Sequence, residues 1–330
     1  MVCSHRRRES SLTKGIQKLI QAVKGSDPLQ SYDNQVLTLI QQNGKASVVA
    51  HRGASATLPE HTLEAYTLAH AQGADYIEPD IILTSDNVLV CLHDLELETT
   101  TDVAARFPDR KRPDGHWYTI DFTLAELKQL RVFGRVDDGE RETMQGYQIA
   151  TLDELILLVQ RLNEVLSRQT ALLIEVKDSE WHAQQGKPLE PVLLQTLARH
   201  KVDTPAGGYI IQSFDEAHLR RLRDMYQCQL PLMWLTSELP SLEKVDGIQA
   251  WAQGINPHRS AIEVDGKPNT AGLAVLERMH SWGMKMFVWT FNDEPDVLQR
   301  FLDCYGVDGV ITNNPDTGVR ALNAGRLKNE

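Results

Sequence analysis

Short apolar runs alternate with longer amphipathic patterns along most of the chain. Apolar residues that recur every three or four positions indicate helices, and short apolar runs bounded by turn residues indicate strands. The predicted strands are 47–50, 75–80, 87–92, 171–177, 208–212, 230–235, 284–290 and 307–312, with a weaker candidate at 254–256. The predicted helices are 62–72, 151–168, 188–200, 215–226, 270–282 and 294–304.

This alternation predicts an α/β fold in which helices cover a parallel sheet. About eight strands suit a closed TIM-type (β/α)8 barrel, so we assign the barrel domain to residues 46–94 and 151–320. An open, doubly wound sheet is the alternative. The glycine fingerprints by which such sheets usually bind phosphate, G-x-G-x-x-G and G-x-x-x-x-G-K-[ST], are both absent from the sequence.

Residues 95–150 interrupt the alternation. They are polar and rich in turn residues, and one helix is predicted near 123–132. A loop of this length inside a compact domain usually carries function or forms a small subdomain. Because the segment directly follows the third predicted strand, we predict a small inserted subdomain that caps a functional site at the end of this strand.

The two ends of the chain lie outside this pattern. Residues 1–45 form a predicted N-terminal helical segment, in which Leu12, Ile16 and Leu19 recur at helical spacing. These helices either pack against the main domain, which we favour, or form a basic amphipathic surface that touches a membrane. Residues 321–330 are predicted to be a C-terminal tail.

Composition and charge restrict the classes of partner. The chain has 330 residues, of which 42% are hydrophobic and 24% charged, as in an ordinary globular enzyme. Its net charge of −11 argues against a nucleic acid partner held by its phosphates. No apolar stretch is long enough to span a membrane, and no export signal follows the arginines at 6–8, so we expect a cytoplasmic protein. The oligomeric state stays open.

Two predicted strands carry charged side chains on one face. Side chains two residues apart in a strand share a face, so Glu78 and Asp80 project together, and so do Glu175 and Lys177. Paired carboxylates on a buried strand require neutralisation, and oxygen ligands of this kind suit Mg²⁺ or Ca²⁺ better than zinc. The alternative is that Glu175 simply pairs with Lys177 while the other two carboxylates face solvent.

Two histidines follow apolar runs at the ends of predicted strands. His51 follows SVVA and His93 follows VLVCL, and in TIM barrels the carboxyl ends of the strands carry the catalytic groups. Cleavage of a phosphodiester needs one group that accepts a proton and one that donates a proton, and imidazoles do both near neutral pH. Arg52 and Lys177 then supply positive charge for the phosphoryl oxygens.

These residues lie in an ordered set of motifs that resembles the glycerophosphodiester phosphodiesterase family. The motifs are HRGASATLPEHTLEAY at 51–66, EPD at 78–80, HD at 93–94, IEVK at 174–177, QSFD at 212–215, FVWTFN at 287–292 and GVDGVITNNP at 306–315. The resemblance covers about 47–318, and the insertion is similar to that of the bacterial periplasmic-type members. It implies a TIM barrel with an inserted subdomain and a divalent cation, Ca²⁺ or Mg²⁺.

The resemblance also implies roles for individual residues. It assigns His51 and His93 as the acid–base pair, Arg52 and Lys177 as phosphate contacts, and the metal ligands as Glu78, Asp80 and Glu175. One departure lies after His93, where the family commonly has an arginine and this chain has Leu97, Glu98 and Thr99. We expect this departure to remove a basic group near the site.

Trp289 ends the strand MKMFVWT and is predicted to face the mouth of the barrel. There it either packs in the core or forms an apolar wall for the glycerol or the head group, with the option of stacking on a choline cation.

The expected reaction is metal-dependent hydrolysis of a small glycerophosphodiester to sn-glycerol 3-phosphate and an alcohol. A phospholipase D-type cleavage of lysophospholipids on the same site is the first alternative, and it would need an apolar groove or a membrane-binding face. A non-catalytic barrel that binds phosphate esters is the second, and it predicts the loss of a catalytic group. All the implied groups are present.

Overall fold

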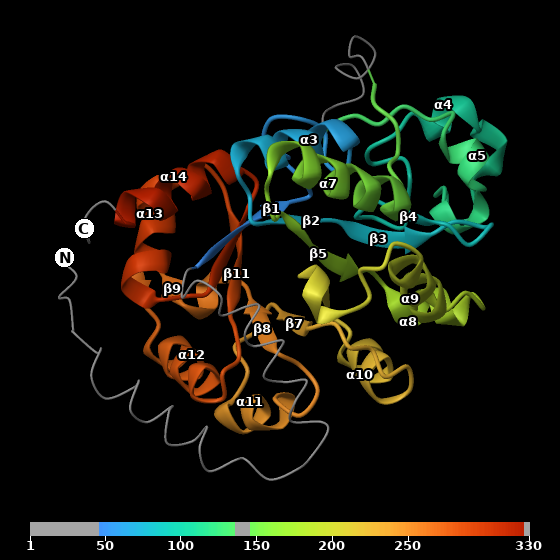
Figure 1. Cartoon of the computed structure of the whole chain (residues 1–330). Coiled ribbons are helices and arrows are strands. Elements are labelled where there is room, and N and C mark those ends of the chain that lie inside the picture. The colour runs from blue at the N-terminus through green and yellow to red at the C-terminus, as the bar shows by residue number, and fades with distance from the viewer. Residues whose placement is uncertain (1–45, 136–145, 327–330) are drawn as a thin grey trace. The chain divides into compact units, whose positions relative to one another are not determined.

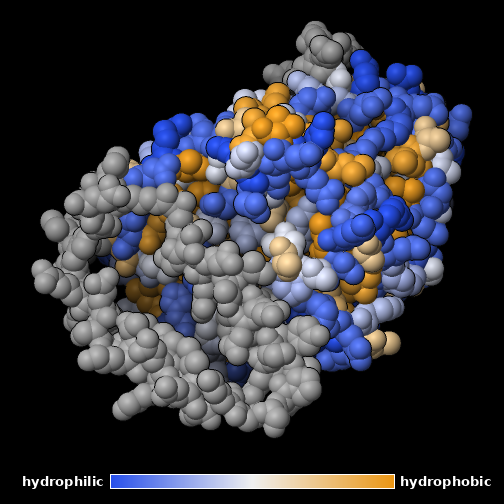
Figure 2. Space-filling model, viewed as in Figure 1, coloured by the Kyte–Doolittle hydropathy of each residue, from blue (hydrophilic) through white to orange (hydrophobic). Residues whose placement is uncertain are grey.

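The computed structural model of the chain describes residues 46–135 and 146–326. The helical segment predicted within 1–45 lies outside the described residues. Among those described, no helix combines the length and the apolar character that crossing a membrane requires. On the face in Figure 2, hydrophobic residues form separate patches among hydrophilic ones.

Parallel strands form a nearly closed barrel, which confirms the predicted TIM-type fold (Figure 1). Its strands are β1 (Ser47–His51), β2 (Tyr76–Glu78), β3 (Asp80–Leu83), β5 (Ala171–Val176), β6 (Ile210–Ser213), β7 (Leu232–Thr236), β8 (Gly254–Pro257), β11 (Phe287–Phe291) and β12 (Gly309–Thr312). They follow the order β11-β12-β1-β2-β5-β6-β7-β8. β3 continues β2 beyond Pro79, and both pair with β5. Parallel bridges from Gly254 to Lys285 and from His258 to Trp289 join β8 to β11.

Helices surround this barrel in Figure 1. They are α3 (Leu63–Gln72), α7 (Leu152–Leu166), α8 (Ser179–Gln184), α9 (Leu189–Arg199), α10 (Glu216–Asp224), α11 (Leu242–Ile248), α12 (Thr270–Ser281), α13 (Pro295–Gln299), which passes into a π-helical turn at Arg300–Tyr305, and α14 (Pro315–Arg326). Local sequence sets their starts: Thr151 and Glu154 form a capping box at the start of α7. α14 continues past residue 320 to Arg326.

Two strand predictions were wrong about which strand belongs to the barrel. A strong candidate lies outside the parallel ring, and a weak candidate belongs to it. Residues 87–92 contain β4 (Leu89–Cys91), which runs antiparallel to β3 and takes no part in the parallel ring. The weak candidate 254–256 is β8, a strand of the barrel. For β4 the reason is the short connection to β3. The turn between Thr84 and Val88 allows an antiparallel hairpin, whereas a parallel connection needs a dozen or more residues.

The segment between β4 and α7 packs around a hydrophobic cluster of its own. It contains α4 (Val103–Arg106) and α5 (Leu124–Leu127), which lie beside β3 and β4 in Figure 1. The cluster includes Leu97, Phe122 and Val132, together with Ile82 and Val90 of the β3–β4 hairpin. The helix predicted at 123–132 is shorter than expected, since only 124–127 is α-helical.

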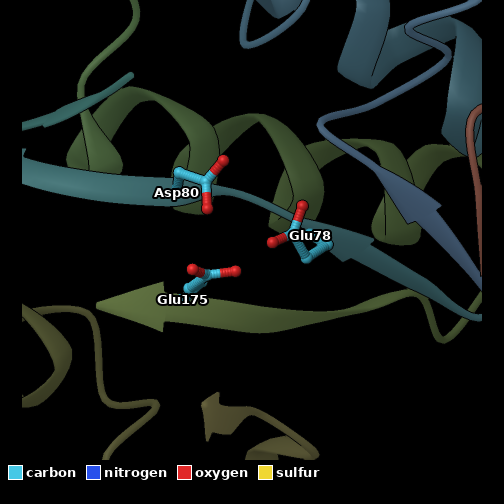
Figure 3. A group of neighbouring side chains, drawn as sticks. All are labelled: Glu78, Asp80 and Glu175. Atoms are coloured by element: carbon cyan, nitrogen blue, oxygen red, sulfur yellow. The ribbon is translucent and has the colours of Figure 1, made fainter. Parts of the chain in front are cut away.

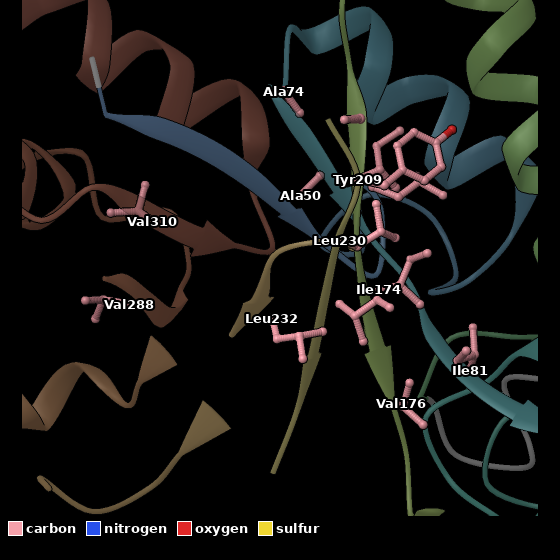
Figure 4. Close-up of a cluster of buried hydrophobic side chains, with 14 of the residues drawn as sticks. Ala50, Ala74, Ile81, Ile174, Val176, Tyr209, Leu230, Leu232, Val288 and Val310 are labelled. Atoms are coloured by element: carbon pink, nitrogen blue, oxygen red, sulfur yellow. The ribbon is translucent and has the colours of Figure 1, made fainter. Parts of the chain in front are cut away.

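The main core fills the space between the strands and the helices around them (Figure 4). Val48 and Ala50 of β1, Ile174 of β5 and Val310 of β12 are fully buried there. The alternate residues of the same strands form a second apolar layer across the barrel interior: Val49, Leu173, Ile210, Met233, Phe287 and Ile311. This strand alternation positions the site, because residues two further along the strands also face the interior.

Candidate active site

Polar side chains lie directly beyond the inner apolar layer, at the carboxyl end of the barrel. His51 lies two residues after Val49 on β1, and Glu175 lies two after Leu173 on β5. Gln212 has the same position on β6 relative to Ile210. The alternation of each strand therefore directs these groups toward one region.

The carboxylates of Glu78, Asp80 and Glu175 point toward one another (Figure 3). One oxygen atom from each lies within 4.8 Å of the others. Asp80 and Glu175 are register partners on β3 and β5, and Glu78 ends β2. All three side chains are buried, with residue exposures of 1%, 1% and 7%. The sequence analysis predicted that these three carboxylates lie close together, and the structure places them close together.

Burial and the charges of neighbouring groups shift the pKa values of these carboxyl groups. Burial and the charges of Asp80 and Glu175 raise the pKa of Glu78 well above its usual value. Burial and Asp80 raise the pKa of Glu175 to about 8. Burial acts in the same direction on Asp80, but the hydrogen bond from His61 and the charge of Lys177 hold its pKa well below the usual value.

The chemistry of this cluster suits a divalent cation. Asp80 Oδ1 is buried and has no hydrogen-bond partner within the described part of the chain. A buried carboxylate oxygen without a partner is costly, and coordination by a hard cation removes that cost. The three residues offer only oxygen ligands, which suits Mg²⁺ or Ca²⁺.

Arg52 lies in a tight left-handed turn that follows β1. Its φ is 58° and that of Gly53 is 86°, and a Cβ on Gly53 would lie 2.9 Å from the Ala65 carbonyl carbon. The turn directs the Arg52 backbone N–H to Glu78 Oε2 at 3.0 Å. Its guanidinium Nε lies 3.4 Å from Asp80 Oδ2. The glycine of the HRG motif is therefore required by the backbone geometry.

Lys177 directly follows β5 and lies beside the carboxylates. Its Nζ is 2.7 Å from Glu175 Oε1 and 3.9 Å from Asp80 Oδ1. Burial lowers the pKa of Lys177, but these two carboxylates outweigh burial and raise it above the usual value. The Glu175–Lys177 pairing that the sequence left open is thus present, and it coexists with the carboxylate cluster.

His51 ends β1 and is held by a side-chain amide. Its Nδ1 lies 2.7 Å from Asn313 Oδ1, and Asn313 in turn donates through Nδ2 to Asn292. The amide oxygen therefore faces the imidazole, so that Nδ1 carries the proton and Nε2 is free to accept one. Burial and the nearby Arg52 lower the pKa of His51 to about 3.

His93 reaches the site by a different route from the one expected. It follows β4, which returns antiparallel to β3, so it does not end a barrel strand. Its Nδ1 lies 2.5 Å from Asp94 Oδ1, which leaves Nε2 for the substrate. His93, Glu175 and Lys177 line one open cavity of about 520 Å³.

Several side chains at this site were missed by the sequence analysis. His61 contacts Asp80 Oδ2 through Nε2 and the Tyr66 hydroxyl through Nδ1, each at 2.9 Å. Glu60 accepts a hydrogen bond from Arg52 at 3.0 Å. Both residues lie inside the motif at 51–66, and Asn313 lies inside the motif at 306–315, so the motifs themselves were the signal for all three.

Arg135 also lies at the site, against expectation. The sequence lacks an arginine shortly after His93, and we expected the loss of a basic group there. Instead, Arg135 NH1 lies 3.0 Å from Asp94 Oδ2, so a basic group reaches this point from the far end of the insertion. A contact between residues this far apart in the sequence leaves no local pattern.

Trp289 is half-buried near the mouth of the barrel. Its ring packs against Phe214 and His258, with centroid separations of 5.6 Å and 5.1 Å, and its Nε1 donates to the Asn256 carbonyl at 2.8 Å. Phe214 lines the cavity, and Trp289 contacts it edge to face. A role for Trp289 in binding the alcohol stays a prediction.

Comparisons with known proteins agree on one family. The model of the glycerophosphoryl diester phosphodiesterase family matches residues 51–317. A glycerophosphodiester phosphodiesterase of Haemophilus influenzae is 28% identical over 334 residues, covering 86% of this chain and 91% of that protein. One from Bacillus subtilis is 29% identical over 279 residues, covering 81% of this chain and 83% of that protein.

A solved structure shares the fold. It is a phosphodiesterase from Oleispira antarctica in complex with the product sn-glycerol-3-phosphate, with a TM-score of 0.64 and 23% identity. The likeness covers 84% of this chain and 96% of that one.

Proposed function

This chain belongs to the glycerophosphoryl diester phosphodiesterase family and is a phosphoric diester hydrolase, and we propose that it releases sn-glycerol 3-phosphate by acid–base catalysis between His51 and His93. The observation that carries the proposal is the pair of imidazoles whose Nδ1 atoms are both engaged, by Asn313 and Asp94. Their Nε2 atoms remain for the reaction. The product seen in the Oleispira antarctica relative supports the same substrate class.

Glu78, Asp80 and Glu175 are the residues that hold a divalent cation in this proposal. Their shared position supports it, and so does Asp80 Oδ1, which is buried without a hydrogen bond in the described part of the chain. When bound, such a cation supplies Lewis-acid stabilisation of a phosphoryl oxygen. Activity measured separately in Ca²⁺ and in Mg²⁺ identifies the cation that serves.

The chain's own residues bind the diester and move the protons. Arg52 and Lys177 bind phosphoryl oxygens as negative charge develops on them. One histidine takes the proton of the attacking oxygen, which belongs to water or to the glycerol 2-hydroxyl, as that oxygen bonds to phosphorus. The other gives a proton to the alcohol oxygen as its bond to phosphorus breaks. When the 2-hydroxyl attacks, the product of this step is a cyclic phosphate. Water then bonds to phosphorus as the bond to the 2-oxygen breaks, which yields sn-glycerol 3-phosphate.

The cavity beside His93 supports a small polar alcohol as the other part of the substrate. Carboxylates of Glu96, Asp178 and Glu180 line it and suit hydroxyl or cationic groups, while Trp181 and Phe214 offer apolar contact. Such a mixed lining suits a small polar or cationic alcohol, and lysophosphatidylcholine stays the alternative substrate that the assay tests.

The testing experiment follows glycerol 3-phosphate release from glycerophosphocholine with a coupled dehydrogenase, in Ca²⁺, in Mg²⁺ and in excess EDTA. We expect release that EDTA abolishes and one cation restores. His93→Ala should lower turnover by at least about a hundredfold. His116→Ala serves as the matched control and should keep its turnover. His116 lies in the insertion, and its imidazole is hydrogen-bonded to Glu98 and not to a site residue.

Two outcomes contradict the proposal. Unchanged turnover in His93→Ala removes this histidine from the mechanism. No release from folded protein under any condition rejects this substrate class, and lysophosphatidylcholine then becomes the substrate to test.

A further inference from the structure

The guanidinium of Arg135 joins two carboxylates that belong to different parts of the site. Its Nε and NH2 donate to Glu60 Oε2 and Oε1 at 3.0 Å and 2.9 Å. Its NH1 lies 3.0 Å from Asp94 Oδ2. Glu60 comes from the loop after β1, and Asp94 follows β4, so one side chain bridges the barrel and the hairpin. A forked guanidinium is the group that makes such a bridge with fixed geometry.

On one side, this bridge reaches the imidazole of His93. Asp94 uses Oδ1 for His93 Nδ1 and Oδ2 for Arg135. The hydrogen bond from His93 and the charge of Arg135 hold the pKa of Asp94 well below its usual value. With both oxygens engaged, the carboxylate has one orientation, and the ring plane of His93 is set by it. A carboxylate with only one partner could turn about its side-chain torsions and carry the ring with it.

On the other side, the bridge reaches the guanidinium of Arg52. Glu60 accepts from Arg52 NH1 at 3.0 Å with the same Oε1 that Arg135 NH2 contacts. Burial raises the pKa of Glu60, but the hydrogen bond from Arg135 and the charge of Arg52 lower it to about 2. Arg135 therefore shares Glu60 with Arg52. Without Arg135, both Glu60 oxygens are free to hold Arg52 and to withdraw it from phosphate.

The backbone that carries Arg135 is anchored in the insertion. Phe133 is 1% exposed and its N–H donates to the Thr100 carbonyl at 2.8 Å. Val132 belongs to the hydrophobic cluster of the insertion and pairs with Tyr147 and Thr101. The guanidinium thus extends from a fixed point, although its side chain is 39% exposed.

We propose that Arg135 is a positioning residue through which the insertion aligns His93 and Arg52, by way of Asp94 and Glu60. The proposal rests on the function proposed above for those two site residues. It assigns the insertion a part in catalysis and supplies, from a distant position, the basic group that the sequence lacks after His93.

The test compares Arg135→Ala and Arg135→Lys with Arg131→Ala. Arg131 is the matched control, because it makes a similar contact, Nε to Asp102 Oδ2 at 2.9 Å, four residues earlier on the same segment, without reaching a site residue. We expect Arg135→Ala to lower kcat about tenfold to a hundredfold with little change in thermal unfolding. Arg135→Lys should recover a part of the loss, because lysine keeps the charge and loses the fork.

Chemical rescue separates positioning from a structural role. Added guanidinium at low millimolar concentration should raise kcat of Arg135→Ala and leave the wild type and Arg131→Ala unchanged. Equal kcat in Arg135→Ala and Arg131→Ala overturns the proposal, and so does a loss that neither lysine nor guanidinium reduces. If the wild type itself releases no glycerol 3-phosphate, the proposed function fails and this result is distinguishable from the first two.

Discussion

Glu78, Asp80 and Glu175 are held together at an electrostatic cost, which makes the stability of the cation-free protein depend on pH. Burial and Asp80 raise the pKa of Glu175 to about 8, from an ordinary value of 4.5. A carboxyl group whose pKa is raised by folding favours the folded state below its unfolded pKa, and this contribution is lost as the pH rises through the folded pKa. Without a cation, stability should therefore fall across the interval between these two values.

Glu175→Gln should remove part of that fall, because an amide stays neutral. In EDTA at about pH 8.5, we expect the variant to have a free energy of unfolding about 1–2 kcal/mol above that of the wild type. At about pH 5 the two proteins should be nearly equal, since Glu175 is protonated in the fold. Urea titrations at both pH values measure the difference. A gap that is the same at both values contradicts the prediction.

At the scale of elements, the buried carboxylate of Glu190 connects the neighbouring helices α9 and α10. Glu190, in the first turn of α9, is 2% exposed and accepts hydrogen bonds from His218 Nδ1 at 3.1 Å and Arg221 Nε at 2.8 Å, both on α10. Burial raises the pKa of Glu190, but these two partners outweigh it and lower the pKa to about 2. The contact thus stabilises the α9–α10 pair in the ionised form.

The sign of the pH dependence is opposite to that of Glu175. A depressed folded pKa contributes stability above the unfolded pKa of about 4.5, and this stability is lost as the pH falls toward about 2. Glu190→Gln should therefore lower the free energy of unfolding by about 1–2 kcal/mol at neutral pH, and by progressively less below about pH 4.5. Glu164→Gln, on an exposed Arg161 pair, is the control and should change it by less than about 0.5 kcal/mol. Urea unfolding measures the difference in unfolding free energy between Glu190→Gln and the wild type. A difference that does not change with pH would reject the ionised Glu190 contact.

At the scale of the whole molecule, the carboxylate cluster joins segments that are distant in the sequence. Glu78 and Asp80 come from β2 and β3, and Glu175 comes from β5, with the insertion and α7 between them in the chain. A ligand that binds all three favours the folded state as a whole, because the unfolded chain does not bring them together.

Cation removal should therefore lower the stability of the whole fold. At a cation concentration about a hundred times its Kd, we expect a gain of about 2.7 kcal/mol relative to EDTA. This corresponds to a rise in Tm of roughly 3–5 °C for a protein of this size. Calorimetric scans with Ca²⁺, Mg²⁺ and EDTA measure the shift. Glu175→Gln should reduce it, and an identical shift in that variant would place the cation elsewhere.

The local pattern of the sequence determined the α/β barrel and much of the candidate site. Strand alternation is a property of the backbone, so the spacing of Glu78 and Asp80, and of Glu175 and Lys177, already placed each pair on one face. The motifs then indicated the family, which the comparisons confirm. The roles of His51, His93 and the other site residues stay predictions.

Tertiary structure alone decided which distant residues meet. It set β4 antiparallel to β3, made β8 a barrel strand and brought Asn313 to His51 and Arg135 to Asp94. The physical reason is that these contacts join residues far apart in the chain or depend on how the chain closes. Hydrophobic periodicity records which side of an element is buried, but it does not record which other element covers it.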